Sequence, residues 1–326
     1  MNKINVLVTG GAGYIGSQVC KHLHSSNFSP ITFDNLSSGN QSFVKWGPLI
    51  KADILNTEKI IETIKIYKPK AIIHFAAKSI VEESQKNLDM YMKVNVDGTK
   101  SILSAMKQTG LNKIIYSSTA AVYGNKYKTD ITEDFPENPI NNYGTTKLLS
   151  EKIIKDSYKN LSIDSIVLRY FNASGCDHEE GIGEMHDPET HLIPNITQNM
   201  IKGEVSNIYG NDFDTKDGTC IRDFIHVKDL ASAHVLALKH ILNNKISDTF
   251  NLGTGKGHSV QDVINTYEEI FSKNCKIKIS NRRDGDPASL VANVEKFKKT
   301  FNWDTQHSSL HNIIDSDIKW RLSIKT

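Results

Sequence analysis

A glycine-rich turn near the start of the chain constrains the fold more than any other feature of the sequence. The apolar run Ile4–Thr9 leads directly into the segment GGAGYIG, residues 10–16. Its glycines can be parsed as G-x-x-G-x-x-G from Gly10 or as G-x-G-x-x-G from Gly11. Either parse supplies a tight turn, a bare backbone and close packing of the following helix. The sequence therefore predicts a strand, a glycine turn and then a helix.

Apolar runs alternate with helical spacing through the first half of the chain. Between the runs, residues 57–67 and 90–109 have the spacing of amphipathic helices. This order, with strands apolar throughout, predicts an α/β fold: a doubly wound Rossmann parallel sheet covered on both faces. After the first run, the further predicted strands are Pro30–Asp34, Ala71–Phe75, Lys113–Ser118 and Ser165–Tyr170.

The character of the sequence changes after Asn172. Residues 173–192 are rich in Gly, Asp, Glu and His and predict a long loop. The remainder mixes short strands at 250–252 and 276–279 with helices at 227–242 and 260–271, which predicts a smaller mixed α/β lobe. We expect one domain over 1–175, with a returning segment near 220–245, and a second over 176–326.

Composition narrows the functional classes. The 326 residues include 39 basic and 37 acidic residues, so the balance of charge gives no reason to expect nucleic acid or an anionic membrane as a partner. No apolar run is long enough to span a bilayer, and the start of the chain does not have a secretory signal pattern. The four cysteines are scattered, which favours free thiols and a cytoplasmic location over disulfides or a zinc site.

An acidic residue at the end of the second strand completes the glycine motif. Asp34 stands where a carboxylate can accept hydrogen bonds from both ribose hydroxyls and repel a 2′-phosphate, which favours NAD over NADP. The alternative is an ordinary turn aspartate. The diphosphate would lie at the N-terminus of the helix that begins near Tyr14, where N–H groups and the helix dipole attract anions. Asp53 is predicted near the adenine end, although a solvated loop acid is nearly as consistent.

A tyrosine and a lysine follow the hydroxyl-rich end of the fourth strand. Tyr143 and Lys147 are four residues apart, so on a helix they share one face. A free phenol has a pKa of about 10, and lowering it by ~3 units needs ~4 kcal/mol of electrostatic bias. We expect the Lys147 ammonium to supply part of that bias, so that Tyr143 exchanges a proton with a sugar hydroxyl. Thr119, with Ser118 as the alternate, is expected to hold the same hydroxyl.

Together these motifs resemble the extended short-chain dehydrogenases. Further segments in both halves of the chain narrow the resemblance to the UDP-galactose 4-epimerases, and it runs from about residue 4 to about residue 305. The segments are LRYFN at 168–172, YGND at 209–212, DGTCIRDFIHV at 217–227, NLGTG at 251–255 and RRDGDPA at 282–288.

The resemblance implies a reaction, a cofactor and the residues that bind them. A UDP-hexose would lie between the lobes, NAD would take hydride from C4, and the transient 4-keto sugar would turn over before hydride returns. It also implies a homodimer formed through helices near 90–110 and 145–160. The implied catalytic residues are Tyr143, Lys147 and Thr119. The implied NAD contacts are Gly10, Gly13, Tyr14, Ile15, Gly16, Asp34, Asn35, Asp53, Ile54, Phe75, Ala76, Ala77, Ser117, Tyr143, Lys147 and Tyr170. The implied UDP-sugar contacts are Thr119, Tyr143, Asn172, His191, Leu192, Tyr209, Arg222, Arg283, Asp286 and Leu290.

Two departures from the family pattern bear on specificity. Lys78 lies one position before the family's lysine, so Ser79 takes the matching place. Leu290 replaces a tyrosine found in some members, and the smaller residue would admit an N-acetyl group. UDP-N-acetylhexosamines and UDP-pentoses therefore remain alternative substrates.

Other classes fit the sequence less well. A sugar-nucleotide 4,6-dehydratase would carry an acid pair after Thr119, where this chain has Ala120-Ala121. A non-catalytic NAD-binding scaffold would not need Thr119, Tyr143 and Lys147 together. We expect no metal, because the candidate ligands lie on a loop whose spacing fixes no ligand geometry. Those candidates are His178, Glu179, Glu180, Glu184, His186 and His191.

Overall fold

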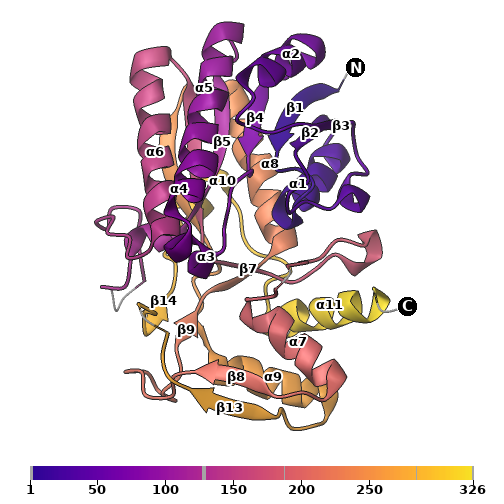
Figure 1. The fold of residues 1–326 in the computed structure, drawn as a ribbon, viewed down its shortest axis with the longest axis vertical. Coiled ribbons are helices and arrows are strands. Elements are labelled where there is room, and N and C mark those ends of the chain that lie inside the picture. The colour runs from indigo at the N-terminus through magenta and orange to yellow at the C-terminus, as the bar shows by residue number, and fades with distance from the viewer. Residues whose placement is uncertain (1–2, 127–129, 187, 284, 325–326) are drawn as a thin grey trace. The chain divides into compact units, whose positions relative to one another are not determined.

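The computed structural model describes residues 3–126, 130–186, 188–283 and 285–324. Within these residues, seven strands form one large sheet (Figure 1). The pairs β1·β2, β1·β4, β2·β3 and β4·β5 are parallel. The predicted α/β class with a Rossmann-like sheet is confirmed. In spatial order the strands are β11 (Ser247–Leu252), β6 (Asp164–Tyr170), β5 (Lys113–Thr119), β4 (Ala71–His74), β1 (Ile4–Thr9), β2 (Phe28–Asp34) and β3 (Leu49–Lys51).

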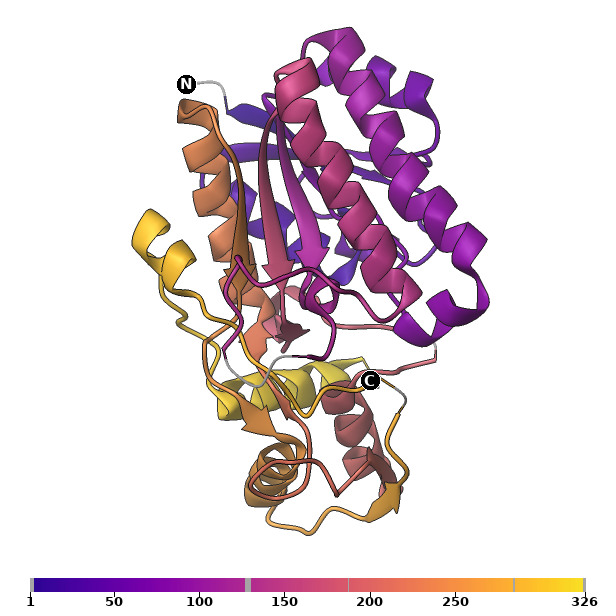
Figure 2. The ribbon, with the colours of Figure 1, turned by 90° about the vertical axis from the view of Figure 1, so that its left-hand side faces the viewer.

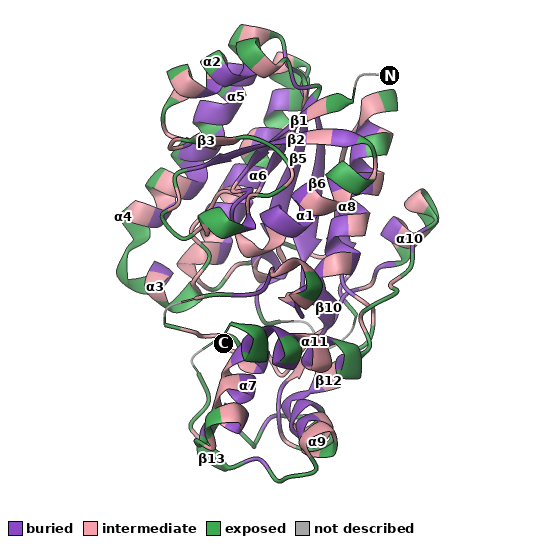
Figure 3. Cartoon of the chain, turned by 90° about the vertical axis from the view of Figure 1, so that its right-hand side faces the viewer, coloured by how far each residue is buried: buried purple, intermediate pink, exposed green. Residues whose placement is uncertain are grey.

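Helices cover both faces of this sheet. Helices α2, α5 and α6 lie on one face, and α1 and most of α8 lie on the other (Figures 1 and 2). The strands other than β3 are largely buried, whereas the helices have exposed residues on their outer sides (Figure 3). These elements are α1 (Tyr14–Ser25), α2 (Thr57–Tyr67), α3 (Val81–Lys86), α4 (Leu88–Tyr91), α5 (Gly98–Thr109), α6 (Asn142–Leu161) and α8 (Val227–Asn243), with 3-10 turns η1 (Gln41–Phe43) and η3 (Ala120–Tyr123).

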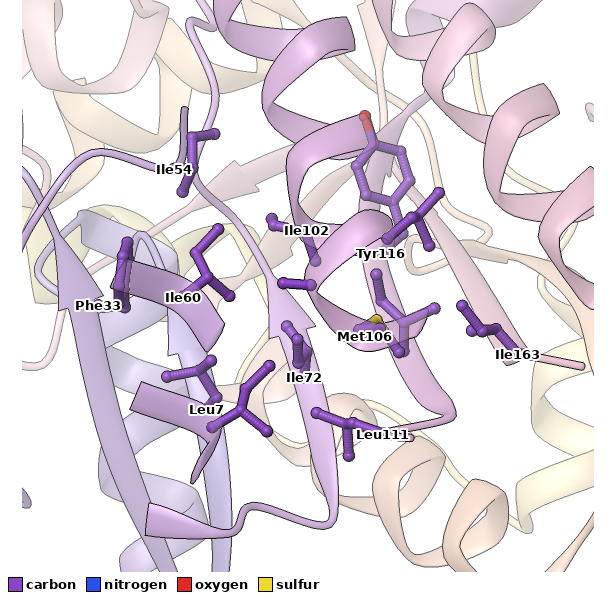
Figure 4. Close-up of a cluster of buried hydrophobic side chains, with 14 of the residues drawn as sticks. Leu7, Phe33, Ile54, Ile60, Ile72, Ile102, Met106, Leu111, Tyr116 and Ile163 are labelled. Carbon is purple, nitrogen blue, oxygen red and sulfur yellow. The ribbon is translucent and has the colours of Figure 1, made fainter. Parts of the chain in front are cut away.

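The core beneath α2 and α5 explains why these segments form helices. Ile60 of α2 and Ile102 and Met106 of α5 pack on Leu7 and Ile72 of the strands, and all five side chains are buried (Figure 4). The spacing of Ile102 and Met106 places both on one side of α5. The buried apolar area of this cluster is the main source of stability for the sheet.

The helical segment predicted at 90–109 is not one regular helix. A π-helical turn, η2 (Met92–Asp97), lies between α4 and α5. Such turns are rare and occur frequently at functional sites. Periodicity alone does not reveal the turn, because one wider turn hardly disturbs the apolar pattern.

Strand β11 corrects another expectation. We placed residues 250–252 in the smaller lobe, but β11 lies at the edge of the large sheet beside β6. The apolar run is too short to indicate which sheet it joins. The chain therefore returns to the large sheet after α8.

The chain folds into two compact units. The first comprises 1–122, 137–169 and 230–250, and the second comprises 123–136, 170–229 and 251–326. Each unit has its own hydrophobic core. The second core contains Ile193, Val263 and Ile313, which come from its three longer helices.

The second unit contains small sheets and four helices within the described residues. Strand β7 pairs with β10, β9 lies between β12 and β14, and β8 pairs with β13. Residues 173–192 are not wholly a loop, since they include the end of β7, the turn η4 (His178–Glu180) and a bridge between Asp177 and Ile182. The other elements are α7 (Leu192–Lys202), β8 (Ser206–Tyr209), β9 (Ile221–Arg222), β10 (Phe224–His226), β12 (His258–Ser259), α9 (Val260–Phe271), β13 (Ile277–Ser280), β14 (Ser289–Leu290), α10 (Glu295–Phe301) and α11 (Leu310–Ser323), with β7 at Asn172–Ser174.

Two further expectations concern membrane-spanning helices and disulfides. No helix in the described part of the chain combines the length and apolar character needed to cross a bilayer. The four cysteines, which all lie in that part, are buried and form no disulfide.

Candidate active site

The glycine turn adopts a conformation that side chains would obstruct. Gly10 has a φ of +73°, and its N–H donates to the Phe33 carbonyl at 2.9 Å. A Cβ at Gly10 would lie 2.5 Å from the Ala76 nitrogen, and one at Gly16 would lie 2.2 Å from the Gly10 oxygen. Helix α1 begins at Tyr14 with Gly13 as its N-cap and no acidic residue in its first turn. The turn therefore presents an uncluttered, electropositive helix end that fits a diphosphate, and Ile15 lies in that first turn.

Asp34 ties the end of β2 to this turn. Its Oδ2 accepts from the Ala12 N–H at 3.0 Å, and its Oδ1 accepts from the Leu36 N–H at 2.8 Å. Burial raises the pKa of the carboxyl group, and these two hydrogen bonds oppose the shift. Each oxygen keeps a further lone pair, so the carboxylate is held in place and can still accept from ribose hydroxyls.

Asn35 and Asp53 lie next to each other, as two residues that contact the same cofactor must. The Asn35 Nδ2 donates to Asp53 Oδ2 at 2.8 Å, while the Leu55 N–H donates to Asp53 Oδ1 at 2.9 Å. The neighbouring Ile54 side chain points into the apolar core, where a Cβ at Gly98 would approach its Cδ1 to 2.4 Å. Any contact of Ile54 with a cofactor would therefore involve its backbone.

The segment after β4 lies directly against the glycine turn. The N–H groups of Phe75 and Ala76 both donate to the Thr9 carbonyl, at 2.9 and 3.1 Å. The Phe75 ring lies 5.0 Å from the His234 ring. This places Phe75, Ala76 and Ala77 along the same end of the sheet as the turn.

The backbone of Lys78 is clamped by a residue that the sequence did not single out. Asn95, in the π-helical turn, accepts from the Lys78 N–H at 2.8 Å and donates to the Lys78 carbonyl at 3.0 Å. Its amide nitrogen also donates to Thr146 Oγ1 on α6 at 3.1 Å. Asn95 thus couples this segment to α6, the helix that carries Tyr143. Only knowledge of the π-helical turn could have pointed to Asn95 as a site residue.

Local packing fixes Tyr143 at the start of α6. Asn141 caps the helix by accepting from the Gly144 N–H at 2.8 Å, and the Tyr143 N–H donates to Ser84 Oγ at 3.1 Å. A Cβ at Gly144 would lie 2.7 Å from the Ala121 carbonyl oxygen. The glycine after Tyr143 therefore lets the helix approach the end of β5, where Thr119 lies.

Burial dominates the electrostatics of the Tyr143–Lys147 pair in the chain without cofactor. Burial raises the pKa of Tyr143 to about 12, and a hydrogen bond with the Thr119 side chain opposes this shift. Burial also lowers the pKa of Lys147 to about 7, against the attraction of Glu151. The Lys147 Nζ lies 4.5 Å from the centroid of the Tyr116 ring. Desolvation disfavours both charged forms, so the share of the bias that we expect from Lys147 has to act against burial.

Ser118 and Thr119 are not equivalent in the structure. The buried Ser118 hydroxyl donates to Glu151 Oε1 at 2.5 Å, whereas Thr119 Oγ1 accepts from the Ala121 N–H at 3.2 Å. Ser118 is thus engaged inside the protein, which favours Thr119 over it as the residue near a substrate hydroxyl. The nearby Ser117 and Tyr170 side chains are buried on β5 and β6.

Glu151 is a second residue that we did not anticipate. It is fully buried and receives two hydrogen bonds from Arg169, at 3.0 Å from Nε and 2.6 Å from Nη2. It lies four residues after Lys147, so the spacing 143, 147 and 151 marks one face of α6. This spacing is the signal in the sequence that could have pointed to Glu151.

In the second unit, the structure brings the predicted sugar-nucleotide residues into small groups. Arg222 Nη1 donates to the carbonyls of Ile221 and Pro287, both at 2.8 Å, and its Nη2 lies 3.4 Å from Asp286 Oδ1. Leu290 pairs with Arg222 in register between β14 and β9. The guanidinium carbon of Arg283 lies 4.0 Å from the centre of the exposed Tyr209 ring; Asp284, beside it in the sequence motif, lies outside the described residues.

Asn172 and His191 lie at the starts of two other elements of this unit. The Asn172 N–H donates to the Asp223 carbonyl at 2.9 Å, while its buried Oδ1 accepts no hydrogen bond from any described residue. His191 precedes Leu192, the first residue of α7. The His191 Nδ1 lies 2.8 Å from Glu184 Oε1, and this carboxylate raises the pKa of His191 to about 10.

The first unit thus contains a glycine turn on a parallel sheet, a ribose-type acid, and a half-buried tyrosine one helical turn before a buried lysine. This combination defines a dinucleotide-dependent enzyme that acts on hydroxyl-bearing carbon.

Comparison with known proteins specifies the family. The model of the NAD dependent epimerase/dehydratase family matches residues 6–253, and the chain belongs to this family. It is 42% identical over 321 residues, 98% of each chain, to the UDP-glucose 4-epimerase of Rhizobium meliloti (strain 1021). The crystal structure of the Brucella ovis UDP-glucose 4-epimerase in complex with NAD matches with a TM-score of 0.93 and 41% identity, over 97% of each chain. The UDP-Glc/GlcNAc 4-epimerase of Campylobacter jejuni matches with a TM-score of 0.85 and 34% identity, over 98% of this chain and 99% of that one.

Proposed function

We propose that this protein is an NAD-dependent UDP-glucose 4-epimerase that interconverts UDP-glucose and UDP-galactose. The observation that carries the proposal is half-buried Tyr143, with buried Lys147 on the same helix face and Thr119 as a hydrogen-bond partner, in a chain that matches such epimerases over nearly its whole length. The family gives the reaction class, and these three residues supply groups that the reaction needs.

The first unit fits NAD as the resident cofactor. Gly10, Gly13 and Gly16 leave the backbone bare where a diphosphate would bind, and Asp34 is held where it would accept from ribose hydroxyls. Except for Tyr170, the remaining NAD contacts proposed from the family resemblance belong to the same unit. Bound NAD supplies the acceptor and donor of hydride at the sugar carbon.

Residues of the chain itself transfer the proton. With a pKa of about 12, the Tyr143 phenol is protonated in the protein alone, so it becomes a base only when further positive charge enters the site. Thr119 shares a hydrogen bond with that phenol and is the group proposed to hold O4 of the sugar. Tyr143 would then take the proton from O4 and return it to the same oxygen after inversion.

The second unit supplies groups for the UDP moiety. We assign the diphosphate to Arg222 and Arg283, because guanidinium groups bind phosphate oxygens in a fork. The Tyr209 ring and the Asp286 carboxylate lie beside these two arginines. Asn172, whose buried oxygen pairs with no described residue, and His191 and Leu192 at the start of α7 complete the proposed set.

The decisive experiment is Tyr143→Phe. We expect turnover to fall by about 10²–10⁴-fold, the contribution typical of a positioned acid or base, while UDP binding measured by calorimetry changes little. Tyr158→Phe, on the exposed side of the same helix, is the matched control and should retain full activity. Near-normal turnover of Tyr143→Phe with UDP-galactose would refute the assignment of the base.

One position favours a second substrate class. Leu290 is only partly buried and pairs with Arg222, and a relative of this chain is named a UDP-Glc/GlcNAc 4-epimerase. We propose that the protein also accepts UDP-N-acetylglucosamine. Leu290→Tyr should depress that activity selectively, and an equal loss with UDP-glucose would contradict the specificity role.

We also infer a cytoplasmic homodimer. Helices α5 and α6 pack side by side on one face of the first unit, where the family resemblance places the dimer helices (Figure 2). Light scattering should give twice the 36.5 kDa of one chain. The four buried free thiols are consistent with a reducing compartment.

A further inference from the structure

Four side chains converge in the second unit, on the segment that leads into α7. They are Glu184, His186, Glu189 and His191, and each directs one donor atom to a common point, with all four atoms within 4.8 Å of one another. The donor atoms are two carboxylate oxygens and the Nδ1 atoms of both imidazoles. Our proposed function involves only one of these residues, His191.

The four carboxylate–imidazole distances in this cluster are compatible with ligation of a single metal ion. Glu184 Oε1 lies 2.8 Å from the His191 Nδ1 and 3.2 Å from the His186 Nδ1. Glu189 Oε1 lies 3.3 Å from the His191 Nδ1 and 3.9 Å from the His186 Nδ1. Ligands at about 2.0–2.1 Å from a tetrahedral zinc ion are about 3.3 Å apart, which is close to the mean of these distances.

Among the described residues, the His186 Nδ1 is the least engaged of the four donor atoms. The His186 Nδ1 is buried and makes no hydrogen bond with any described residue, although Glu184 lies beside it. Its contact with Glu184 Oε1 at 3.2 Å is poorly directed for a hydrogen bond, so this nitrogen is available to a metal ion. The two carboxylate side chains are themselves almost entirely buried, with 5% and 4% exposure.

A second set of contacts holds the ligands in place. Arg321 Nη2 donates to the Glu184 carbonyl at 3.1 Å and lies 3.3 Å from Glu189 Oε2. The N–H groups of Thr190 and His191 donate to Glu189 Oε1, at 2.9 and 3.1 Å. Metal sites commonly orient their carboxylates through such outer hydrogen bonds.

We propose that Glu184, His186, Glu189 and His191 bind one divalent transition metal ion, with zinc as the best fit. Two imidazoles and two carboxylates suit zinc, and two buried carboxylates balance its charge. Four protein ligands leave no open position on a four-coordinate ion, so the ion is structural. It ties His186 and His191 to Glu184 and Glu189, which Arg321 of α11 contacts. The earlier expectation of no metal rested on sequence spacing, which could not show that the chain folds these donors together.

The site can be tested without reference to catalysis. Protein stripped with a chelator and dialysed should take up one zinc ion per chain by mass spectrometry. Cobalt in place of zinc should give the intense visible absorption of a tetrahedral centre. Metal should also raise the midpoint of thermal unfolding, because it binds the folded state alone.

Variants distinguish metal binding at this site from adventitious metal binding elsewhere. Glu184→Gln and His186→Ala should lose the bound ion, whereas His178→Ala, which removes a histidine from the same segment outside the cluster, should keep it. The cobalt spectrum of the unaltered protein decides the question even if a variant fails to fold. A stripped protein that takes up no stoichiometric zinc, or an octahedral cobalt spectrum, or equal uptake by His186→Ala, would overturn the proposal.

Discussion

At the scale of single residues, burial governs the chemistry of the tyrosine–lysine pair. Folding lowers the pKa of Lys147 from 10.5 to about 7, chiefly through desolvation. A lysine shifted downwards destabilises the folded state. The penalty is complete below about pH 7, where the amine is charged in both states, and disappears as the pH rises through 10.5.

Replacing this lysine should therefore stabilise the NAD-free protein. Lys147→Met is expected to unfold at higher urea concentration than the unaltered protein below pH 7, with a difference that shrinks towards pH 10.5. Activity should be lost at the same time, the usual trade between stability and function. Lys159→Met, at an exposed position of the same helix, should change the free energy of unfolding little. A Lys147→Met protein that is less stable at every pH would contradict this account.

Some of these residue properties were predictable and some were not. The spacing of Tyr143 and Lys147 placed both on one helix face, because helical periodicity is local. Their pKa directions were not predictable, because desolvation depends on what the rest of the chain packs around them. For the same reason, the residues that neighbour Ser118 in the sequence could not predict its hydrogen bond to Glu151.

At the scale of elements, a buried ion pair joins α6 to β6. Arg169 forms two hydrogen bonds with Glu151 and also lies 2.5 Å from Glu137. Removing one partner of such a pair leaves an uncompensated charge in the interior. The link fixes the helix that carries Tyr143 and Lys147 against the sheet.

We expect Glu151→Gln to lower the free energy of unfolding by about 3–5 kcal/mol, measured by urea denaturation. Glu82→Gln is the matched control, because the pair between Glu82 and Lys86 is exposed and should contribute about 0–1 kcal/mol. Equal, small losses for both variants would show that the buried pair does not fix α6.

The elements themselves were largely predictable. Strands such as Ile4–Thr9 and helices such as Thr57–Tyr67 follow from apolar runs and periodicity, and their bounds agree with the structure. The π-helical turn at Met92–Asp97 and the placement of β11 beside β6 were not predictable, because both depend on contacts with distant segments.

At the scale of the whole molecule, cofactor binding should be visible in thermal unfolding. NAD at 100 times its dissociation constant adds about 2.7 kcal/mol of stability. We expect NAD to raise the midpoint of unfolding of cofactor-free protein and NADP to raise it much less, because the Asp34 carboxylate repels a 2′-phosphate. Asp34→Asn should narrow that difference, and equal shifts from the two cofactors in the unaltered protein would argue against this role of Asp34.

The division of the chain into units has a consequence for its synthesis. The chain passes between the two units at five points, after residues 122, 136, 169, 229 and 250. A ribosome must therefore translate as far as β11 before the first unit is complete. Until then β6 exposes an unpaired edge that other nascent chains can join. A gene fragment that stops near residue 175 would make this exposed edge permanent, so it should yield aggregated product rather than a separable nucleotide-binding half.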